Sequence, residues 1–208
     1  MASTTLRSIV LASAFAAVAV AAPVANESPI EGYAIVPATW ELDGPDGQVI
    51  QLNGTVQEVV AQLDVIVPNS RNKLIADIAT ASASAAEAST LERRYDEESL
   101  HCFVSPWGNG YVDSIQDGIN YLNNVPGRPW HNPGPGNCAR VSCSYRSAIY
   151  WCNDNRFRKE LNSFKDIAHG ADRIKNTCRR QDGVGSLVTN GQIFYTDGWN
   201  VIVRSDSC

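Results

Sequence analysis

Six cysteines carry the clearest chemistry in this chain, and all of them lie in its C-terminal half. They are Cys102, Cys138, Cys143, Cys152, Cys178 and Cys208. Paired thiols become disulfides in an oxidising compartment, so an even number predicts three bridges in an exported chain. A zinc site would need a second close pair besides Cys138 and Cys143, which the sequence does not offer. We therefore expect no metal site and no cofactor.

The search for catalytic residues starts from the histidines. These are His101, His131 and His169. A ribonuclease needs a histidine and a glutamate to pass a proton, and an arginine to hold the phosphate. His169, Glu160 and Arg140 could be assembled into such a site, although nothing in their spacing requires it. Motifs for a serine nucleophile or a phosphate loop are absent. We expect no catalytic residue and keep a small extracellular hydrolase as an alternative.

Two tryptophans in polar loops are candidates for recognition. Trp107 stands beside Gly108, and Trp130 stands between a proline and a histidine. Exposed tryptophans can hold a sugar ring or a partner protein, whereas half-buried ones close the ends of a small core. Asp154, which has an asparagine on each side, could bind a cation or ligand, but that pattern is more typical of a turn.

The first 21 residues predict export. Arg7 precedes a short apolar run at 9–20, and Ala19 and Ala21 have the spacing that signal peptidase accepts. The run is shorter than the roughly 20 residues of a membrane-spanning helix. We therefore expect a secreted, extracellular protein without stable membrane insertion.

Arg93-Arg94 divides the remaining chain. Together with Leu91-Glu92, this pair resembles the cut site of kexin-type proteases, and it follows an Ala/Ser-rich stretch at 79–86 that we expect to be an accessible linker. The expected parts are a signal peptide (1–21), a propeptide (22–94) and a mature domain (95–208), with a kexin-type protease as a partner during secretion. The propeptide could assist folding, block activity in transit or act as a spacer.

The two parts differ in charge. Residues 22–94 hold ten acidic and four basic side chains, a net charge of −6, whereas residues 95–208 hold twelve of each. Nucleic-acid binding needs a basic excess, so we expect no nucleic-acid partner. The glycosylation sequons at Asn26 and Asn53 both lie in the propeptide.

Hydrophobic spacing predicts the elements that position these residues. In the propeptide, alternating runs at 40–42 and 49–52 flank a Gly/Pro turn and precede a helix, for which Thr55 and Glu58 have capping-box spacing. This is a small β-β-α unit with no staple.

The expected elements of the mature domain alternate between helices and strand pairs. Apolar residues three and four apart predict helices, and β-branched runs around turn residues predict hairpins. They are a helix at 112–122, a hairpin of 139–144 and 148–152 around Tyr145-Arg146, a helix from Ser163 to Cys178, and strands at 187–189, 192–195 and 199–204 with turns at Asn190-Gly191 and Asp197-Gly198. This order predicts an α+β two-layer sandwich, an antiparallel sheet with two helices on one face.

The disulfide pairing can be ranked. Six cysteines allow fifteen pairings. The hairpin register places Cys138 opposite Cys152, and a bridge from Cys102 to Cys178 would tie both helices together. Cys143 and Cys208 are then left as the third pair, although other pairings remain open.

Several blocks of the sequence resemble a family of small secreted proteins of filamentous fungi. These blocks are 52–59, 134–145, 148–155, 167–171 and 199–204. More distantly, the layout is similar to the smut-type killer toxins and the necrosis-inducing effectors. In both, a cysteine-bearing strand pair precedes a helix that ends in cysteine, and a last strand leads to a C-terminal cysteine.

The resemblance implies an α/β sandwich and a toxin-like effector that binds a target, protein or glycan, in a host or a competing microbe. The functional lysine of the killer toxins has no matching position here. A cell-wall or glycan-binding protein is a further alternative.

Overall fold

The computed structural model describes residues 28, 30–43, 47–84 and 95–208. We call residues 28–84 the leader segment and residues 95–208 the cysteine domain. The elements in chain order are β1 (Ala34–Val36), β2 (Thr39–Asp43), β3 (Val49–Asn53), α1 (Val56–Ile66), α2 (Ser70–Ser84), β4 (Glu97–Cys102), β5 (Gly110–Tyr111), α3 (Val112–Asn124), β6 (Trp130–His131), β7 (Asn137–Ser144), β8 (Ser147–Asn153), β9 (Lys159–Glu160), α4 (Phe164–Thr177), β10 (Arg179–Gln181), β11 (Leu187–Thr189), β12 (Gly191–Tyr195) and β13 (Trp199–Arg204).

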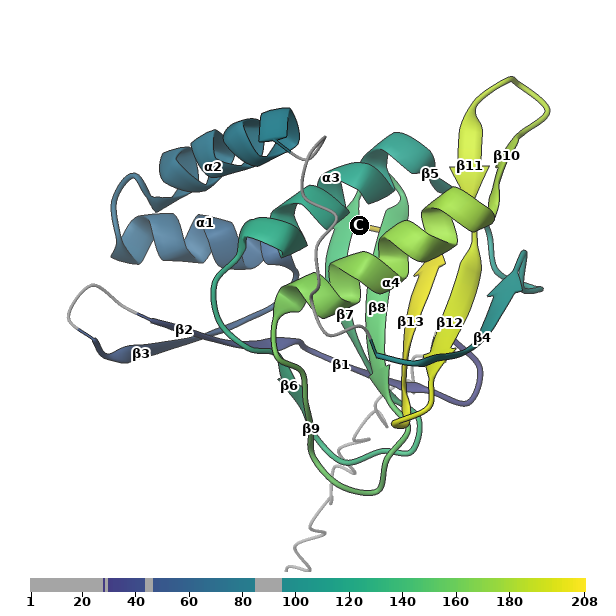
Figure 1. The fold of residues 1–208 in the computed structure, drawn as a ribbon, viewed down its shortest axis with the longest axis horizontal. Coiled ribbons are helices and arrows are strands. Elements are labelled where there is room, and N and C mark those ends of the chain that lie inside the picture. Colours follow the sequence, from purple (N-terminus) through teal and green to yellow (C-terminus); the bar gives the residue numbers. More distant parts are fainter. Residues whose placement is uncertain (1–27, 29, 44–46, 85–94) are drawn as a thin grey trace, which may run out of the picture.

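The main sheet has six strands in the order β1-β7-β8-β13-β12-β4 (Figure 1). Its five strands from the cysteine domain are antiparallel, whereas β1 pairs in parallel with β7. The α+β class is confirmed. The five strands from residues 95–208 pair in the antiparallel way that the sequence predicts, and a strand of the leader segment adds a parallel edge that it does not predict.

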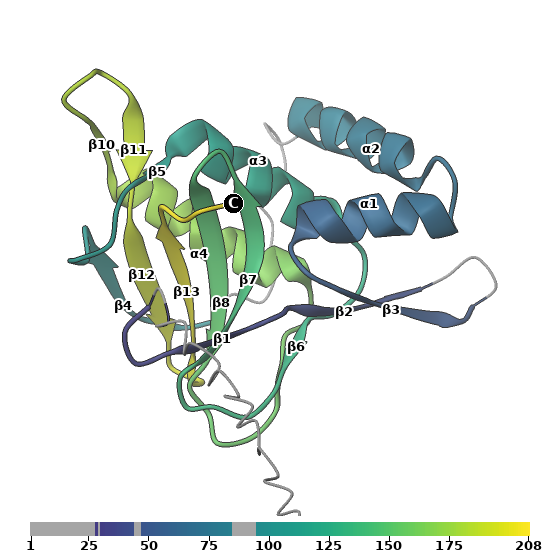
Figure 2. The same ribbon diagram turned by 180° about the vertical axis from the view of Figure 1, so that it is seen from behind.

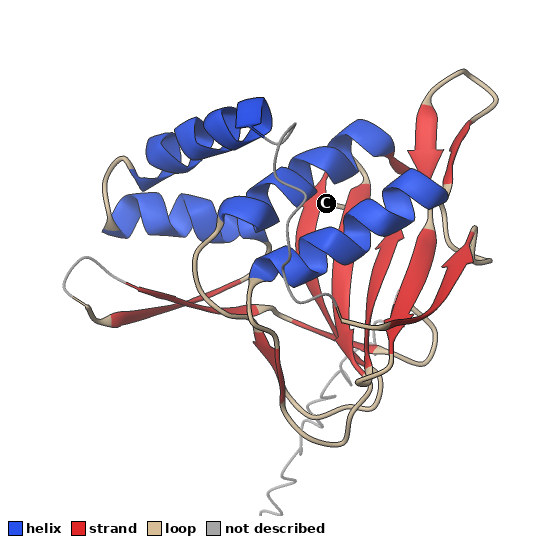
Figure 3. Ribbon diagram, in the orientation of Figure 1, coloured by secondary structure: helices blue, strands red, loops and turns tan. Residues whose placement is uncertain are grey.

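Helices α3 and α4 lie side by side over one face of this sheet (Figure 3). Alternation along the strands sends Val141, Trp151 and Val201 toward the helices, where they are buried in the main core. The opposite face carries a second cluster that includes Tyr150 and Ile202. One face of the sheet therefore packs against the helices, and the other face carries a separate apolar cluster.

Both predicted helices of the cysteine domain are present. In α4, Ser163 and Asp166 form a capping box, and Ile167 and Ile174 are buried, as the spacing predicts. In α3, the face at Ile115 and its neighbours is buried against the sheet. Local sequence signals thus determine where these helices begin and which side they bury.

The turns follow the prediction in two places out of three. Tyr145 and Arg146 adopt positive φ values of 44° and 60° in the β7–β8 hairpin, and Gly198 does so at 77° between β12 and β13. The expected hairpin turn at Asn190-Gly191 is wrong. There β11 pairs with β10 and β5 in a separate sheet, and Asn190 is buried while donating to carbonyl groups of the 104–108 loop.

The three disulfides are the pairs that the sequence ranks first. Their sequence separations are 76 residues for Cys102–Cys178, 14 for Cys138–Cys152 and 65 for Cys143–Cys208. No free cysteine remains. The third bridge ties the C-terminal residue back to β7.

The leader segment contains the predicted β-β-α unit, but it does not fold apart from the rest. In Figure 2, β1 leads into the β2–β3 hairpin, which extends away from the main sheet below α1, and α1 and α2 lie beside α3. Thr55 and Glu58 form the predicted capping box at the start of α1. We expected the Ala/Ser-rich stretch at 79–86 to be a linker. That prediction is wrong for residues 79–84, because α2 continues to Ser84.

Candidate binding site

A cavity of about 760 Å³ lies between the leader segment and the sheet. One wall is built by Arg140 of β7, Tyr150 of β8 and Asp206 of the C-terminal tail, and α1 contributes Glu58 and Gln62 to the other. Side chains from both sides of the expected cut therefore form this site.

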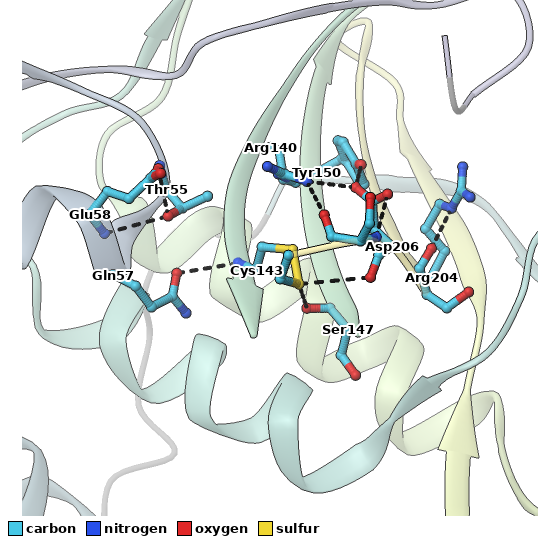
Figure 4. A network of polar contacts seen from close by, with 12 residues as sticks. Thr55, Gln57, Glu58, Arg140, Cys143, Ser147, Tyr150, Arg204 and Asp206 are labelled. Carbon is cyan, nitrogen blue, oxygen red and sulfur yellow. Dashed lines mark hydrogen bonds and ion pairs between the residues drawn. A yellow bond between two sulfur atoms is a disulfide. The ribbon is translucent and has the colours of Figure 1, made fainter. Parts of the chain in front are cut away.

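Arg140, Tyr150 and Asp206 form a connected polar cluster, which we call the Arg140 cluster (Figure 4). The Arg140 Nη1 donates to Asp206 Oδ2 and to the Ser207 carbonyl oxygen, at 2.9 Å each. The Tyr150 hydroxyl donates to the same Asp206 oxygen. Arg140 and Tyr150 are cross-strand partners, so the hairpin register sets their separation.

The surroundings move every pKa in the Arg140 cluster away from neutrality. Burial alone would raise the pKa of Asp206, but hydrogen bonds from Tyr150 and Arg140 outweigh burial and lower it. Burial alone would lower the pKa of Arg140, but Asp206 raises it. Burial and then Asp206 raise the pKa of Tyr150. Arg140 and Asp206 therefore stay charged at neutral pH, and Tyr150 keeps its proton.

The opposite wall adds a further carboxylate. The backbone N–H of Thr55 donates to Glu58 at 2.7 Å and its hydroxyl at 2.9 Å, and these bonds lower the pKa of Glu58. The cavity lining thus holds two carboxylates, Glu58 and Asp206, and one guanidinium, Arg140, a net charge of −1 at neutral pH. Such a site suits a polar ligand group that brings hydrogen-bond donors.

The Cys143–Cys208 disulfide holds the tail at this site. Asp206 lies two residues before Cys208, and the Cys143 backbone N–H is itself bonded to Gln57 of α1 (Figure 4). Sequence reasoning missed Tyr150 and Asp206. The available signal was an aspartate within two residues of a bridged C-terminal cysteine, because that bridge fixes its position.

A second polar network lies on the same face of the sheet. Asn200 is fully buried and donates to Asp154 at 2.7 Å and to the Tyr33 hydroxyl at 3.2 Å. Gln192 donates to Asn200 at 3.0 Å and to the same hydroxyl at 3.3 Å. Burial raises the pKa of Asp154, although bonds from Asn200 and Tyr33 oppose that shift. A leader tyrosine therefore completes a buried network of the cysteine domain.

The candidate ribonuclease residues do not come together. His169 is exposed on α4, on the helix side of the sheet, whereas Arg140 projects from the other face. Glu160, in β9, forms ion pairs with Arg128 and Arg158 instead. His169, the candidate proton-transfer residue, and Arg140, the candidate phosphate-binding residue, thus lie on opposite sides of the sheet.

The other two histidines contact aromatic side chains. His131 is buried against the edge of Trp151, and burial lowers its pKa. His101 is exposed in β4 and contacts the Phe194 ring. Neither His131 nor His101 lines the cavity beside the Arg140 cluster.

Both candidate recognition tryptophans are half-buried. Trp107 packs against the cluster on the back of the sheet, and its carbonyl accepts from Asn190. Trp130 carries the Arg158 guanidinium 4.2 Å from its ring centroid, so that cation covers one of its faces.

Most residues expected to be processed lie outside the described part of the chain. These are Ala21, Asn26, Arg93 and Arg94. Asn53 is described: it is exposed at the end of β3, where its side chain accepts from Thr39 and lines the cavity. A glycan on Asn53 would therefore stand beside the site.

Within residues 28, 30–43, 47–84 and 95–208, no cluster of three or more potential metal ligands occurs. No helix in that same part of the chain has the length and apolar character needed to cross a membrane. Comparisons with protein-family models, with curated proteins and with solved structures find no match to this chain.

Proposed function

We propose that this chain is the precursor of a secreted effector or killer-toxin-like protein, which binds a target in a host or a competing microbe. One observation carries the proposal. The Arg140 cluster combines a cavity with fixed charges, while every pKa in it is shifted away from neutrality. That combination favours recognition over acid–base catalysis.

The architecture supports export as the setting. Three disulfides stabilise a domain that follows a signal-like N-terminus. In this proposal, residues 1–21 direct secretion and a kexin-type protease cuts after Arg94. The mature domain is then a two-layer sandwich, in which α3 and α4 cover one face of five antiparallel strands and the Arg140 cluster lies on the other.

The test uses the purified secreted protein, applied to plant tissue and to cultures of competing fungi. We expect a cell-death or growth-inhibition response that reduction of the disulfides abolishes. The variant Arg140→Gln should weaken the response at least tenfold. Arg156→Gln, at an exposed loop arginine, is the matched control and should retain it. A full response from folded Arg140→Gln would overturn the assignment of the site.

The same preparation separates the two alternatives. Turnover of RNA that disappears with His169→Ala would establish a hydrolase instead. Retention on chitin or glucan that disappears with Trp107→Ala or Trp130→Ala would establish a glycan-binding protein. We expect neither result.

A further inference from the structure

We infer that the leader segment stays bound to the cysteine domain after the chain is cut between them, so that the processed protein has two non-covalently associated chains. This inference rests on the cut at Arg93-Arg94 in the proposed function. The sequence alone leaves three roles open for the leader: to assist folding, to block activity in transit or to act as a spacer.

The leader segment and the cysteine domain share one hydrophobic core. Trp40 of β2 and Phe164 of α4 are each at most 1% exposed, and their rings stack with centroids 4.0 Å apart. The same core contains further leader side chains alongside residues of α3, α4 and the sheet. Those leader residues are Ala38, Leu42, Leu52, Val56, Val59, Val60 and Leu74. Departure of the leader would return this apolar surface to water on both pieces, which opposes dissociation.

The two parts are also joined by backbone pairing in the main sheet. Residues Ala34–Val36 pair in parallel with residues 137–139 of β7, so the leader supplies the edge strand of the main sheet. Without it, β7 would present an unpaired edge.

At two glycines the backbone of the cysteine domain lies close to the backbone of the leader segment. A Cβ at Gly127 would lie 2.3 Å from the Glu41 carbonyl oxygen, and one at Gly136 would lie 2.6 Å from that of Gly32. Both glycines also have positive φ values, of 100° and 79°. The loops of the cysteine domain are therefore shaped around the leader backbone.

Buried polar groups of the cysteine domain also form hydrogen bonds with the leader segment. Gln57 of α1 donates to Ser142 Oγ at 2.8 Å and accepts from the Cys143 backbone N–H at 3.2 Å. On the face of the sheet away from the helices, Tyr33 completes the network of Asn200 and Gln192. Removal of a partner leaves such groups unsatisfied, which is costly for buried amides.

The position of the cut allows retention. The last described residue of α2 is Ser84 and the described chain resumes at Tyr95, next to β4. A cut at Arg93-Arg94 therefore falls between folded elements. All three disulfides lie within the cysteine domain, so non-covalent contacts alone must hold the leader.

Retention would also preserve the cavity beside the Arg140 cluster. Glu58 and Gln62 form its leader wall, opposite Arg140 and Asp206. In the two-chain protein both walls remain, together with any glycan on Asn53. The ligand-binding surface is then built from both products of processing.

The test cuts the purified, uncut secreted chain with a kexin-type protease. A second version carries the recognition sequence of a sequence-specific protease inserted after Thr90. Native size-exclusion chromatography is followed by intact-mass analysis under denaturing conditions. We expect one native peak that contains two chains, which separate only on denaturation. Elution of the leader apart from the cysteine domain would overturn the inference.

The two versions keep the proposals separate. If the kexin-type protease leaves the natural chain intact, the processing step fails, while the inserted site still decides retention. Gln57→Ala and Trp40→Ala should raise the dissociation constant of the cut pair, Trp40→Ala on the order of 100-fold. Val65→Ala, at a leader side chain that is 84% exposed, should leave it unchanged. Equal dissociation constants for Trp40→Ala, Gln57→Ala and the parent would contradict the interface described here.

Discussion

The indole ring of Trp40 stacks on the phenyl ring of Phe164, with 12° between the ring planes. Trp40 belongs to the leader segment and Phe164 is the first residue of α4. Since the expected cut lies between them in sequence, a residue of the leader fills the core of the cysteine domain. The leader segment is thus part of the packed fold.

This stacking predicts coupled losses of stability in the uncut protein. Trp40→Ala and Phe164→Ala should each lower the free energy of unfolding by about 3–5 kcal/mol, because each leaves a cavity in a packed core. The double variant should lose less than the sum, since the second truncation removes a contact that is already gone. Urea denaturation of the four proteins measures this. Additive losses would show that the two rings do not stabilise each other.

Local signals in the sequence predict much of the fold. The capping boxes at Thr55 and Ser163 mark the starts of α1 and α4, and the positive φ values at Tyr145 and Arg146 close the predicted hairpin. The hairpin register in turn yields Cys138–Cys152. These features depend on residues near one another in the chain, which is why they can be read from one sequence.

Long-range relationships could not be predicted in this way. The pairing of β1 with β7 joins residues about a hundred positions apart, with no local pattern that specifies it. Asn190-Gly191 has hairpin chemistry, yet the Asn190 side chain instead bonds to the 104–108 loop. Asp206 joins the Arg140 cluster only because the C-terminal disulfide folds the tail back.

Removal of the Cys143–Cys208 bridge by Cys143→Ala and Cys208→Ala should destabilise the protein by about 4 kcal/mol. This is the chain-entropy value for a loop of 65 residues. The tail would also lose its tether, so Asp206 should dissociate from Arg140 part of the time. Denaturant unfolding gives the stability change, and hydrogen exchange at Ser207 reports the tail. An unchanged midpoint would show that the tail is held without the bridge.

Asp206 predicts an acid-sensitive contribution to stability. Its folded pKa lies below the ordinary value, so the unfolded state binds a proton first as the pH falls. The stabilisation is present above the unfolded pKa of about 3.9 and is lost as the pH drops through the folded value. Asp206→Asn should therefore be less stable than the parent at pH 7 and approach it as the pH falls below the folded pKa of Asp206. A stability difference that stays constant with pH would contradict this.

His131 predicts a second pH dependence, nearer neutrality. Burial lowers its folded pKa below about 6.5, the ordinary value for histidine, so protonation favours the unfolded chain. The contribution of His131 to stability is complete well above that value and is lost as the pH falls through it toward the lower folded pKa. His131→Phe keeps a ring against Trp151 and removes the titration, so its stability should fall less over this range. His169→Gln, at an exposed histidine of α4, should retain the loss seen in the parent. The measurement is the unfolding free energy of the three proteins between pH 7.5 and 5.5. Identical curves for His131→Phe and the parent would assign the pH dependence of stability to another group.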